Sequence, residues 1–211
     1  MFLPLIHPST VLVSGPTGCG KTVFVSRLIK DGMFSKCPER VIWFYNEWQK
    51  LYDDLDSKVE FRKDCDESFY DTLSPLTTNL VVLDDQMSTI GDSKVLLKMF
   101  TEGSHHRNLS VIYIVQNLFD KGRSHRTVSL NAQYIILFKN PRDKSQIDCL
   151  SRQMYGRRSS FLVDCYHDAT RDSYGYLLLD LRPDSDDELR IRSRIFKDEV
   201  CDIYKSTHCS I

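Results

Sequence analysis

The sequence predicts an α/β protein with a central, mostly parallel sheet flanked by helices. Apolar runs of strand length alternate along the chain with stretches of near-helical spacing, a pattern typical of parallel sheets covered on both faces. One of these runs leads into a glycine-rich loop, and a later one leads into two carboxylates. Ligands bind at the carboxyl ends of strands in open α/β sheets, so we expect a binding site along that edge.

The first expected strand, Thr10 to Val13, is followed after one residue by the octapeptide GPTGCGKT, Gly15 to Thr22. This octapeptide fits G-x-x-x-x-G-K-[ST], a loop whose glycines let successive backbone N–H groups face phosphate oxygens. In such a loop Lys21 reaches the β and γ phosphates, and the Thr22 hydroxyl coordinates Mg²⁺ at a helix N-terminus. The residues expected to bind the nucleotide are Gly15, Pro16, Thr17, Gly18, Cys19, Gly20, Lys21 and Thr22.

A helix is expected from Thr22 to Lys30, because apolar residues recur there at near-helical spacing, and Gly32 is a suitable terminator. The run from Arg40 to Tyr45 predicts a buried second strand. The stretch from Asn46 to Leu73 is aromatic and acidic without a clean period and predicts no definite element. We expect Trp43, Tyr45 and Trp48 to pack in the core. Stacking on a base is the less favoured alternative for them.

The next apolar run, NLVVLDD from Asn79 to Asp85, predicts a strand that ends in two carboxylates. We expect Asp84 to hold Mg²⁺ and Asp85 to orient or deprotonate the attacking water, as in nucleotide hydrolases. A strand that merely ends in a solvated acidic turn is the alternative. The preceding phosphate-binding loop favours the catalytic interpretation.

A fourth strand is expected from Ser110 to Val115, ending in Gln116. Gln116 could detect the γ phosphate, as water-positioning glutamines do elsewhere, or it could cap the following turn. A fifth strand is expected from Tyr134 to Phe138, stopped by Pro141 and followed by a helix that runs to Met154, with Asp143 or Ser145 as its cap. This order suits a P-loop ATPase of the additional-strand, RecA-like type, in which a catalytic strand is inserted beside the loop strand.

The C-terminal region predicts a β-hairpin made by Tyr174 to Leu181 and Leu189 to Phe196. The period-two alternation of the second strand places Arg190, Arg192 and Arg194 on one face, where they could protect an edge strand or form a stripe facing DNA or a capsid. Beyond Lys197 we expect a short helix or disorder. We therefore expect an ATPase core at 1–181 and, at 182–211, a hairpin strand and tail that form no independent domain.

The composition limits the class of protein. A formal net charge of −1 argues against a protein that coats nucleic acid over its whole surface, so any such surface is expected to be local. Seven scattered cysteines without a C-x-x-C pair indicate free thiols in a reducing compartment. No apolar run approaches the ~20 residues that span a bilayer, so we expect a soluble, unsecreted, intracellular protein without a membrane partner.

Four segments together resemble the HerA/FtsK superfamily of DNA-pumping ATPases: GPTGCGKTVFVSRLI, VVLDDQM, FTEGSHHRNLSVIYIVQNLF and SLNAQYIILFKNPRDKSQI. Within the superfamily they look most like the packaging ATPases of poxvirus-like large DNA viruses and of Polinton (Maverick) and adintovirus-type elements. The likeness is close from Ser9 to Ile147 and weaker through YGYLLLDL and LRIRSRIF.

The resemblance implies a motor that hydrolyses ATP with Mg²⁺ and moves double-stranded DNA into a capsid. It implies a ring oligomer, a hexamer, with capsid or portal-like partners, in the host nucleus or cytoplasm or associated with the virion. It assigns the Mg²⁺ acid to Asp84, the sensor glutamine to Gln116, and a trans-acting arginine finger to Arg107, which precedes the fourth strand. Many relatives carry Asp-Glu where this chain has Asp84-Asp85, a departure that bears on the role of Asp85 as general base.

Other basic residues carry weaker hypotheses. Arg142 could reach a neighbouring subunit's nucleotide or decorate a helix N-terminus. The segment after the sensor glutamine contains Lys121, Arg123 and Arg126. These residues could face DNA in a central channel, or they could belong to an ordinary solvated loop. His105 and His106 have no partner at metal-ligand spacing and are expected to be exposed.

Two functions of other classes fit part of the pattern. A small-molecule kinase would also use the phosphate-binding loop, with a phosphate-clamping lid made by Arg152, Arg157 and Arg158. The Asp-Asp strand and the strand that ends in glutamine disfavour it. A nucleotide-gated binding protein with little turnover is the non-enzymatic alternative.

Overall fold

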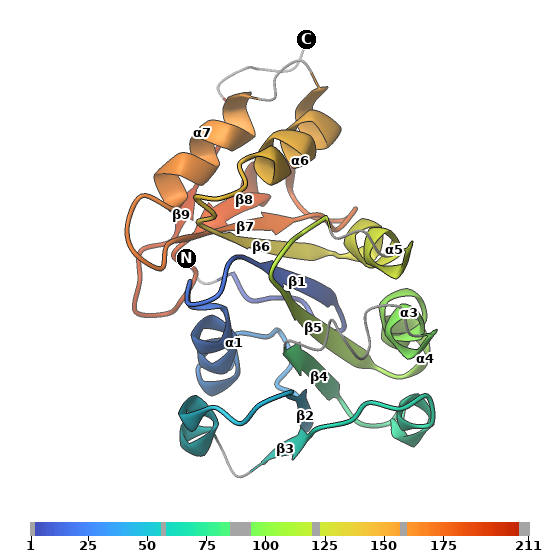
Figure 1. Cartoon of the computed structure of the whole chain (residues 1–211). Helices are drawn as coiled ribbons and strands as arrows, with labels where there is room; N and C mark the ends of the chain where they lie inside the picture. The colour runs from blue at the N-terminus through green and yellow to red at the C-terminus, as the bar shows by residue number, and fades with distance from the viewer. Residues whose placement is uncertain (1–2, 56–57, 85–93, 120–122, 157–159, 207–211) are drawn as a thin grey trace.

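The structure, a computed structural model, describes residues 3–55, 58–84, 94–119, 123–156 and 160–206. Within these ranges nine strands form one sheet in the order β3-β2-β4-β5-β1-β6-β7-β8-β9 (Figure 1). Pairs among β1 to β6 are parallel, and β7, β8 and β9 add antiparallel strands at one side. The strands are β1 (Thr10–Ser14), β2 (Arg40–Phe44), β3 (Val59–Arg62), β4 (Asn79–Asp84), β5 (Leu109–Val115), β6 (Tyr134–Phe138), β7 (Tyr176–Asp180), β8 (Ile191–Ser193) and β9 (Asp202–Ile203).

Helices cover both faces of this sheet, as the alternating pattern predicts. Figure 1 shows α1 on one side of the central strands and α3, α4 and α5 on the other. The helices are α1 (Lys21–Lys30), α3 (Lys94–Thr101), α4 (Gly103–His106), α5 (Arg123–Asn131), α6 (Ser145–Tyr155) and α7 (Ser160–Ala169). Short 3₁₀ turns are η1 (Lys50–Asp54), η2 (Phe69–Thr72) and η4 (Asp187–Leu189).

The core has two layers because successive side chains of a strand point to opposite faces. On β5, Tyr113 packs in the layer that contains α3, α5, α6 and α7, whereas Ile112 and Ile114 pack in the layer that contains α1. All seven residues of β5 are buried. Burial on both faces explains why β5 is a continuous apolar run without alternation.

Strand β5 lies between β1 and β4, which confirms the additional-strand arrangement. Val13 of β1 and Asp84 of β4 are both in register with Ile114 of β5. Since these strands are parallel, their carboxyl ends meet at one edge of the sheet. The phosphate-binding loop, the acidic strand end and Gln116 therefore converge there.

The predicted elements of the core are confirmed within a residue or two. Helix α1 ends at Lys30, and Gly32 adopts a left-handed φ of 57° just beyond it. At the start of α6 the N-cap position is Lys144, while the Asp143 carboxylate accepts a hydrogen bond from the Ser145 backbone N–H at 3.0 Å. The stretch for which no element is predicted contains η1, η2 and the edge strand β3.

The predicted C-terminal hairpin is confirmed by antiparallel pairing of β7 with β8, but two expectations about it are wrong. Strand β8 is no edge strand, because β9 pairs with its other side, in the segment expected to be helical or disordered. The three arginines do not share a face: Arg192 is 3% exposed, Arg190 is half-buried, and Arg194 is exposed with a left-handed φ of 54°. The left-handed residue ends the strand, so the alternation does not continue through Arg194.

In the described ranges, six cysteines are free thiols: Cys19, Cys37, Cys65, Cys149, Cys165 and Cys201. None of the described helices is both long and apolar enough to cross a membrane.

Candidate functional site

The loop from Gly15 to Gly20 connects β1 to α1 at the carboxyl edge of the sheet. Gly20 is the N-cap residue of α1 and has a φ of 102°, a conformation that L side chains rarely adopt. A Cβ atom at Gly15 would lie 2.7 Å from Cβ of Phe138, so this end of the loop packs directly on β6. Both positions require glycine for reasons of geometry that the sequence motif anticipates.

Lys21, the first residue of α1, is buried, and its Nζ lies inside the loop. The ammonium group donates to the Gly15 carbonyl oxygen at 2.6 Å and to the Pro16 carbonyl oxygen at 2.9 Å. These carbonyls hold a positive charge at the centre of the loop. A phosphate bound in the loop would therefore meet a cation that is already in position.

Asp84, the last residue of β4, is 3% exposed. The Tyr52 hydroxyl donates to Oδ2 of Asp84 at 2.9 Å. Tyr52 belongs to η1, in the stretch for which the sequence predicts no element, so this contact is missed by the sequence analysis. The two residues are 32 positions apart, so no local pattern in the sequence relates them.

One cavity of about 810 Å³ brings the predicted residues together. Its lining includes Thr17, Gly18 and Gly20 of the loop, together with Lys21, Thr22, Asp84 and Gln116. Gln116 follows β5 directly and is exposed to the cavity. Asp85, the predicted general base, lies outside the described residues.

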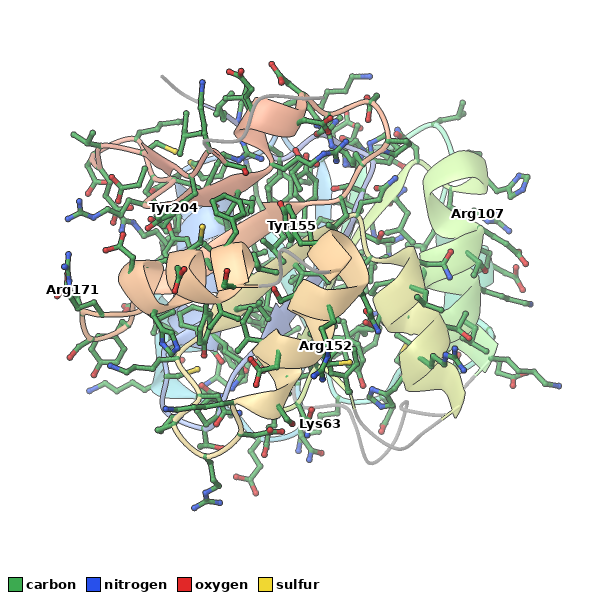
Figure 2. All side chains as sticks on the ribbon, turned by 90° about the horizontal axis from the view of Figure 1, so that it is seen from above. Lys63, Arg107, Arg152, Tyr155, Arg171 and Tyr204 are labelled. Carbon is green, nitrogen blue, oxygen red and sulfur yellow. The ribbon has the colours of Figure 1, made fainter. Side chains whose placement is uncertain are left out.

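Arg107 lies at the opposite edge of the sheet, where β5 begins. It follows α4 as the C-cap residue, and β5 then runs toward Gln116. At about 3.3 Å per residue, the nine positions between Arg107 and Gln116 span roughly 30 Å. In Figure 2, Arg107 lies on the side of the molecule opposite Arg171, which lines the cavity.

The Arg107 guanidinium has partners within the chain. It donates to the Leu73 carbonyl oxygen at 3.2 Å and forms an ion pair with Asp71 at 3.2 Å, and it lies over the Tyr70 ring at 5.2 Å from the centroid. These contacts hold the side chain on the surface of η2. Arg107 therefore does not reach the cavity of its own chain.

The weaker basic candidates whose side chains the structure describes lie outside this cavity. Arg142 and Arg126 are exposed, and neither lines it. Arg152 is exposed on α6, as Figure 2 shows, and it does not line the cavity either. Three other candidates lie outside the described residues: Lys121, Arg157 and Arg158. The structure describes the backbone of Arg123 but not its side chain.

No protein-family model matches the sequence, and no curated protein matches it. Solved structures do match. The genome packaging NTPase B204 from Sulfolobus turreted icosahedral virus 2, in complex with AMPPCP, superposes with a TM-score of 0.57 at 15% identity, covering 93% of this chain and 96% of B204. The ATP-gammaS complex of the same protein gives a TM-score of 0.54 at 16% identity, over 93% and 97% of the two chains. B204 from Sulfolobus Turreted Icosahedral Virus, a DNA-packaging ATPase, gives 0.57 at 13% identity, over 95% and 98%.

This chain has the B204 fold. The match covers nearly the full length of both chains, so it extends beyond the parallel core into the C-terminal part of the chain.

In this B204-like fold, residues near the C-terminus that the sequence analysis did not predict line the other side of the cavity. We call it the C-terminal wall; it is made by cavity-lining residues within 168–176 and 193–204. Strand β7 begins at the carboxyl edge of β6, with Tyr176 opposite Phe138, and β8 ends at this same edge. The connections before β7 and after β8 consequently lie beside the phosphate-binding loop. Sequence reasoning missed them because a local pattern does not reveal which strand ends become neighbours.

Burial raises the pKa of the Cys19 thiol inside the loop, and the nearby Lys21 ammonium only partly opposes this effect. The thiol is therefore protonated at neutral pH and behaves as a small apolar side chain. The Cys19 Sγ packs closely against the start of the loop: a Cβ atom added at Gly15 would lie only 2.7 Å from it.

Proposed function

We propose that this chain is the subunit of an ATP-hydrolysing motor that moves double-stranded DNA into a viral or virus-like capsid. The observation that carries the proposal is the single cavity lined by Lys21, Thr22, Asp84 and Gln116, at the edge where an inserted β5 separates β1 from β4. A phosphate-binding loop, a buried carboxylate and an amide at one strand edge are the parts that nucleotide hydrolysis requires.

The residues present fit Mg²⁺. Thr22 offers a hydroxyl oxygen and Asp84 a buried carboxylate, both hard oxygen ligands that Mg²⁺ prefers, and both line the cavity. In protein sites that act on nucleotides, Mg²⁺ is usually held by one or two protein oxygen ligands together with phosphate and water. When bound, Mg²⁺ would neutralise charge on the β and γ phosphates.

In the proposed reaction, backbone N–H groups of the loop and the Lys21 ammonium bind the triphosphate and stabilise the charge of the transition state. Asp85 orients or deprotonates the attacking water, and Gln116 contacts the γ phosphate and responds to its loss. Because Gln116 directly follows β5, a shift of this residue would be transmitted along a rigid, fully buried strand.

Arg107 is proposed to complete the site of a neighbouring subunit. It is too far from its own cavity to act there, and its guanidinium lies at the surface, 27% exposed, in an ion pair with Asp71 that is accessible to solvent. A ring in which the edge carrying Arg107 faces the next subunit's carboxyl edge would bring the arginine to the phosphates. Each active site would then need two chains.

The DNA and capsid parts of the proposal rest on two supports. The sequence segments around the loop, the acidic strand and β5 resemble HerA/FtsK motors, and within them the packaging ATPases of poxvirus-like viruses and Polinton elements. The fold is that of B204, whose structure is described as that of a DNA-packaging ATPase. On this basis we propose double-stranded DNA, a ring of like subunits, and a capsid or portal-like protein as partners.

The test is steady-state ATP hydrolysis by the full chain, with and without double-stranded DNA, measured against protein concentration. We expect DNA to stimulate hydrolysis and activity to rise cooperatively with concentration. Lys21→Ala should abolish activity, and Arg107→Ala should reduce it by about 10³-fold, because trans-acting arginines contribute on this order. Asp71→Ala is the control, since it removes the ion pair of Arg107 but leaves the guanidinium in place.

Mixing the Lys21→Ala and Arg107→Ala proteins shows whether Arg107 acts on a neighbouring subunit or whether its replacement merely damages the fold. Lys21→Ala and Arg107→Ala are each expected to be inactive, but a ring that contains both has interfaces with an intact Lys21 facing an intact Arg107. Partial recovery of activity in the mixture supports the proposal. Activity that is indifferent to DNA and unchanged by Arg107→Ala would contradict the motor.

A further inference from the structure

The cavity is larger than the phosphate-binding loop needs. Its volume of about 810 Å³ lies within the range of about 300–1,000 Å³ typical of small-molecule sites. The residues proposed to bind phosphate lie in the loop after β1, at the start of α1, at the end of β4 and just after β5. The C-terminal wall lies on the far side of β6, around β7, β8 and β9. A ligand whose phosphates lie in the loop therefore has room to extend toward this wall.

Tyr174 stands where the two parts of the cavity meet. Its side chain is 71% exposed, yet its Cδ1 lies only 3.2 Å from a Cβ atom built on Gly20, the last glycine of the loop. The ring thus lies beside the N-terminus of α1 with much of its surface open. An exposed aromatic ring beside a phosphate-binding loop is suitably placed to stack on a planar ligand group.

The backbone holds Tyr174 in this position. The next residue, Gly175, must be glycine, because a Cβ atom there would lie 2.4 Å from the Ala169 carbonyl oxygen. Tyr174 itself has a φ of 64°, which is uncommon for a bulky L residue. Such conformations cost about 1–3 kcal/mol and cluster at ligand sites.

The same conformation recurs once more in the cavity, at Arg194. Among the described non-glycine residues with positive φ, Tyr174 and Arg194 both line the cavity, and the third, Asn108, is of a type that tolerates this region. The Arg194 guanidinium is 59% exposed and pairs with Asp202 at 3.6 Å. Its planar group can lie against a base by stacking and cation–π attraction.

Four further aromatic rings line the cavity and pack against one another. Phe24 makes edge-to-face contacts with Phe138, Tyr176 and Phe196 at centroid distances of 4.6–5.7 Å, and Phe138 lies tilted against Tyr176 at 5.8 Å. The Tyr176 hydroxyl accepts a hydrogen bond from the Ile195 backbone N–H at 2.9 Å, which ties β7 to the residue after Arg194.

We infer that the C-terminal wall is a nucleoside subsite, in which Tyr174 stacks on the base of the bound nucleotide and Arg194 contacts the base from the wall. This inference rests on the proposed function, because it needs phosphates bound in the loop. The subsite makes the site selective for nucleotides over inorganic polyphosphates. Since every base has a π face, Tyr174 contributes affinity without choosing among bases.

The experiment compares binding of ADP and of inorganic tripolyphosphate, each with Mg²⁺, to the full chain by calorimetry. Tyr174→Gly and Tyr174→Ala should each raise the Kd for ADP by on the order of 10-fold, as loss of base stacking does, and leave the Kd for tripolyphosphate within about twofold. Glycine suits the positive φ, so Tyr174→Gly removes the ring without adding strain. Tyr174→Phe should bind ADP within about twofold, because it keeps the ring.

Arg194→Ala should raise the Kd for ADP by about threefold or more and spare tripolyphosphate. Val200→Ala, an exposed change in the same C-terminal region outside the cavity lining, is the matched control and should change neither Kd. Thermal melts of all variants verify folding.

Outcomes distinguish this inference from the proposed function. Equal weakening of ADP and tripolyphosphate by Tyr174→Gly would overturn the inference, since Tyr174 would then act on the phosphates. An unchanged Kd for ADP in Tyr174→Gly would also overturn it. A wild-type chain that binds neither ligand, or a Lys21→Ala variant that binds both as well as wild type does, would contradict the phosphate site and with it the proposed function.

Discussion

A tyrosine hydroxyl lies against the carboxylate expected to hold Mg²⁺. Tyr52 donates to Asp84 at 2.9 Å, and both residues are buried. The Tyr52 ring packs on Trp43 and Phe61 with centroids 5.4 and 5.2 Å away, so the hydroxyl has little freedom to move. Hydrogen bonds of this kind orient metal-binding carboxylates and commonly contribute 10- to 100-fold to metal affinity.

We predict that Tyr52→Phe raises the Mg²⁺ concentration for half-maximal ATP hydrolysis by about 10-fold, because Asp84 loses a group that orients it. The phenyl ring preserves the packing, so the thermal stability should change little. The measurement is a Mg²⁺ titration of hydrolysis at saturating ATP.

Tyr45→Phe is the matched control for this change. Tyr45 belongs to the same aromatic cluster, with its ring centroid 5.9 Å from that of Tyr52, but the hydroxyl that donates to Asp84 is that of Tyr52. An equal change in Mg²⁺ dependence in both variants would show that the cluster, and not the hydrogen bond to Asp84, is responsible.

Strand β5 links two positions with proposed functional roles that are far apart in space. Gln116 follows its carboxyl end at the cavity, and Arg107 precedes its amino end near η2. The strand pairs with β1 on one side and β4 on the other. Strand β5 therefore connects the cavity with the opposite edge of the sheet through one fully buried element.

The C-terminal strands depend on a buried cluster of charges. Arg192 of β8 pairs with Asp180 of β7 at 3.1 Å, and their side chains are 3% and 5% exposed. Arg182 pairs with the same carboxylate at 3.1 Å. Asp180 is thus balanced by two arginines, and this balance explains why a charged side chain of β8 lies inside the protein.

We predict that Arg192→Ala lowers the free energy of unfolding by about 3 kcal/mol, because it leaves the buried Asp180 with fewer partners. Arg194→Ala, which breaks only the solvent-exposed pair with Asp202, should cost less than about 1 kcal/mol. Urea unfolding measures both. If both variants lost the same free energy of unfolding, the buried ion pair of Arg192 would stabilise the protein no more than the exposed pair of Arg194 does.

The complete cavity exists only when the parallel core and the antiparallel C-terminal strands come together. Its lining includes residues from Thr17 to Tyr204, so a bound nucleotide would contact both parts of the chain. A ligand that binds only the folded state stabilises the protein in proportion to the logarithm of its concentration.

We predict that Mg²⁺ with ADP at about 100 times its Kd raises the melting temperature by roughly 5–10 °C, corresponding to about 2.7 kcal/mol for a chain of this size. Removal of the metal with EDTA should reduce this shift, since Thr22 and Asp84 then lose their link to the phosphates. Differential scanning calorimetry measures the change. An undiminished shift in Lys21→Ala would contradict binding in the loop.

The sequence by itself determined the parallel core and the part of the site that is proposed to bind phosphate. The motif from Gly15 to Thr22 is local: its glycines, Lys21 and Thr22 act through backbone geometry within one strand-loop-helix unit. Asp84 and Gln116 could be predicted because each directly follows a buried apolar strand, and parallel strands bring their carboxyl ends together.

Only the tertiary structure decided which distant segments complete the cavity. Tyr52 meets Asp84, and Tyr174 meets Gly20, through contacts between residues that no local pattern relates. The alternation in β8 indicates two different faces, but whether Arg192 is exposed or buried depends on the strand that pairs beside it and on Asp180 of β7. The physical reason is that periodicity records the direction of a side chain relative to its own backbone, whereas burial and contact depend on the neighbours that the fold supplies.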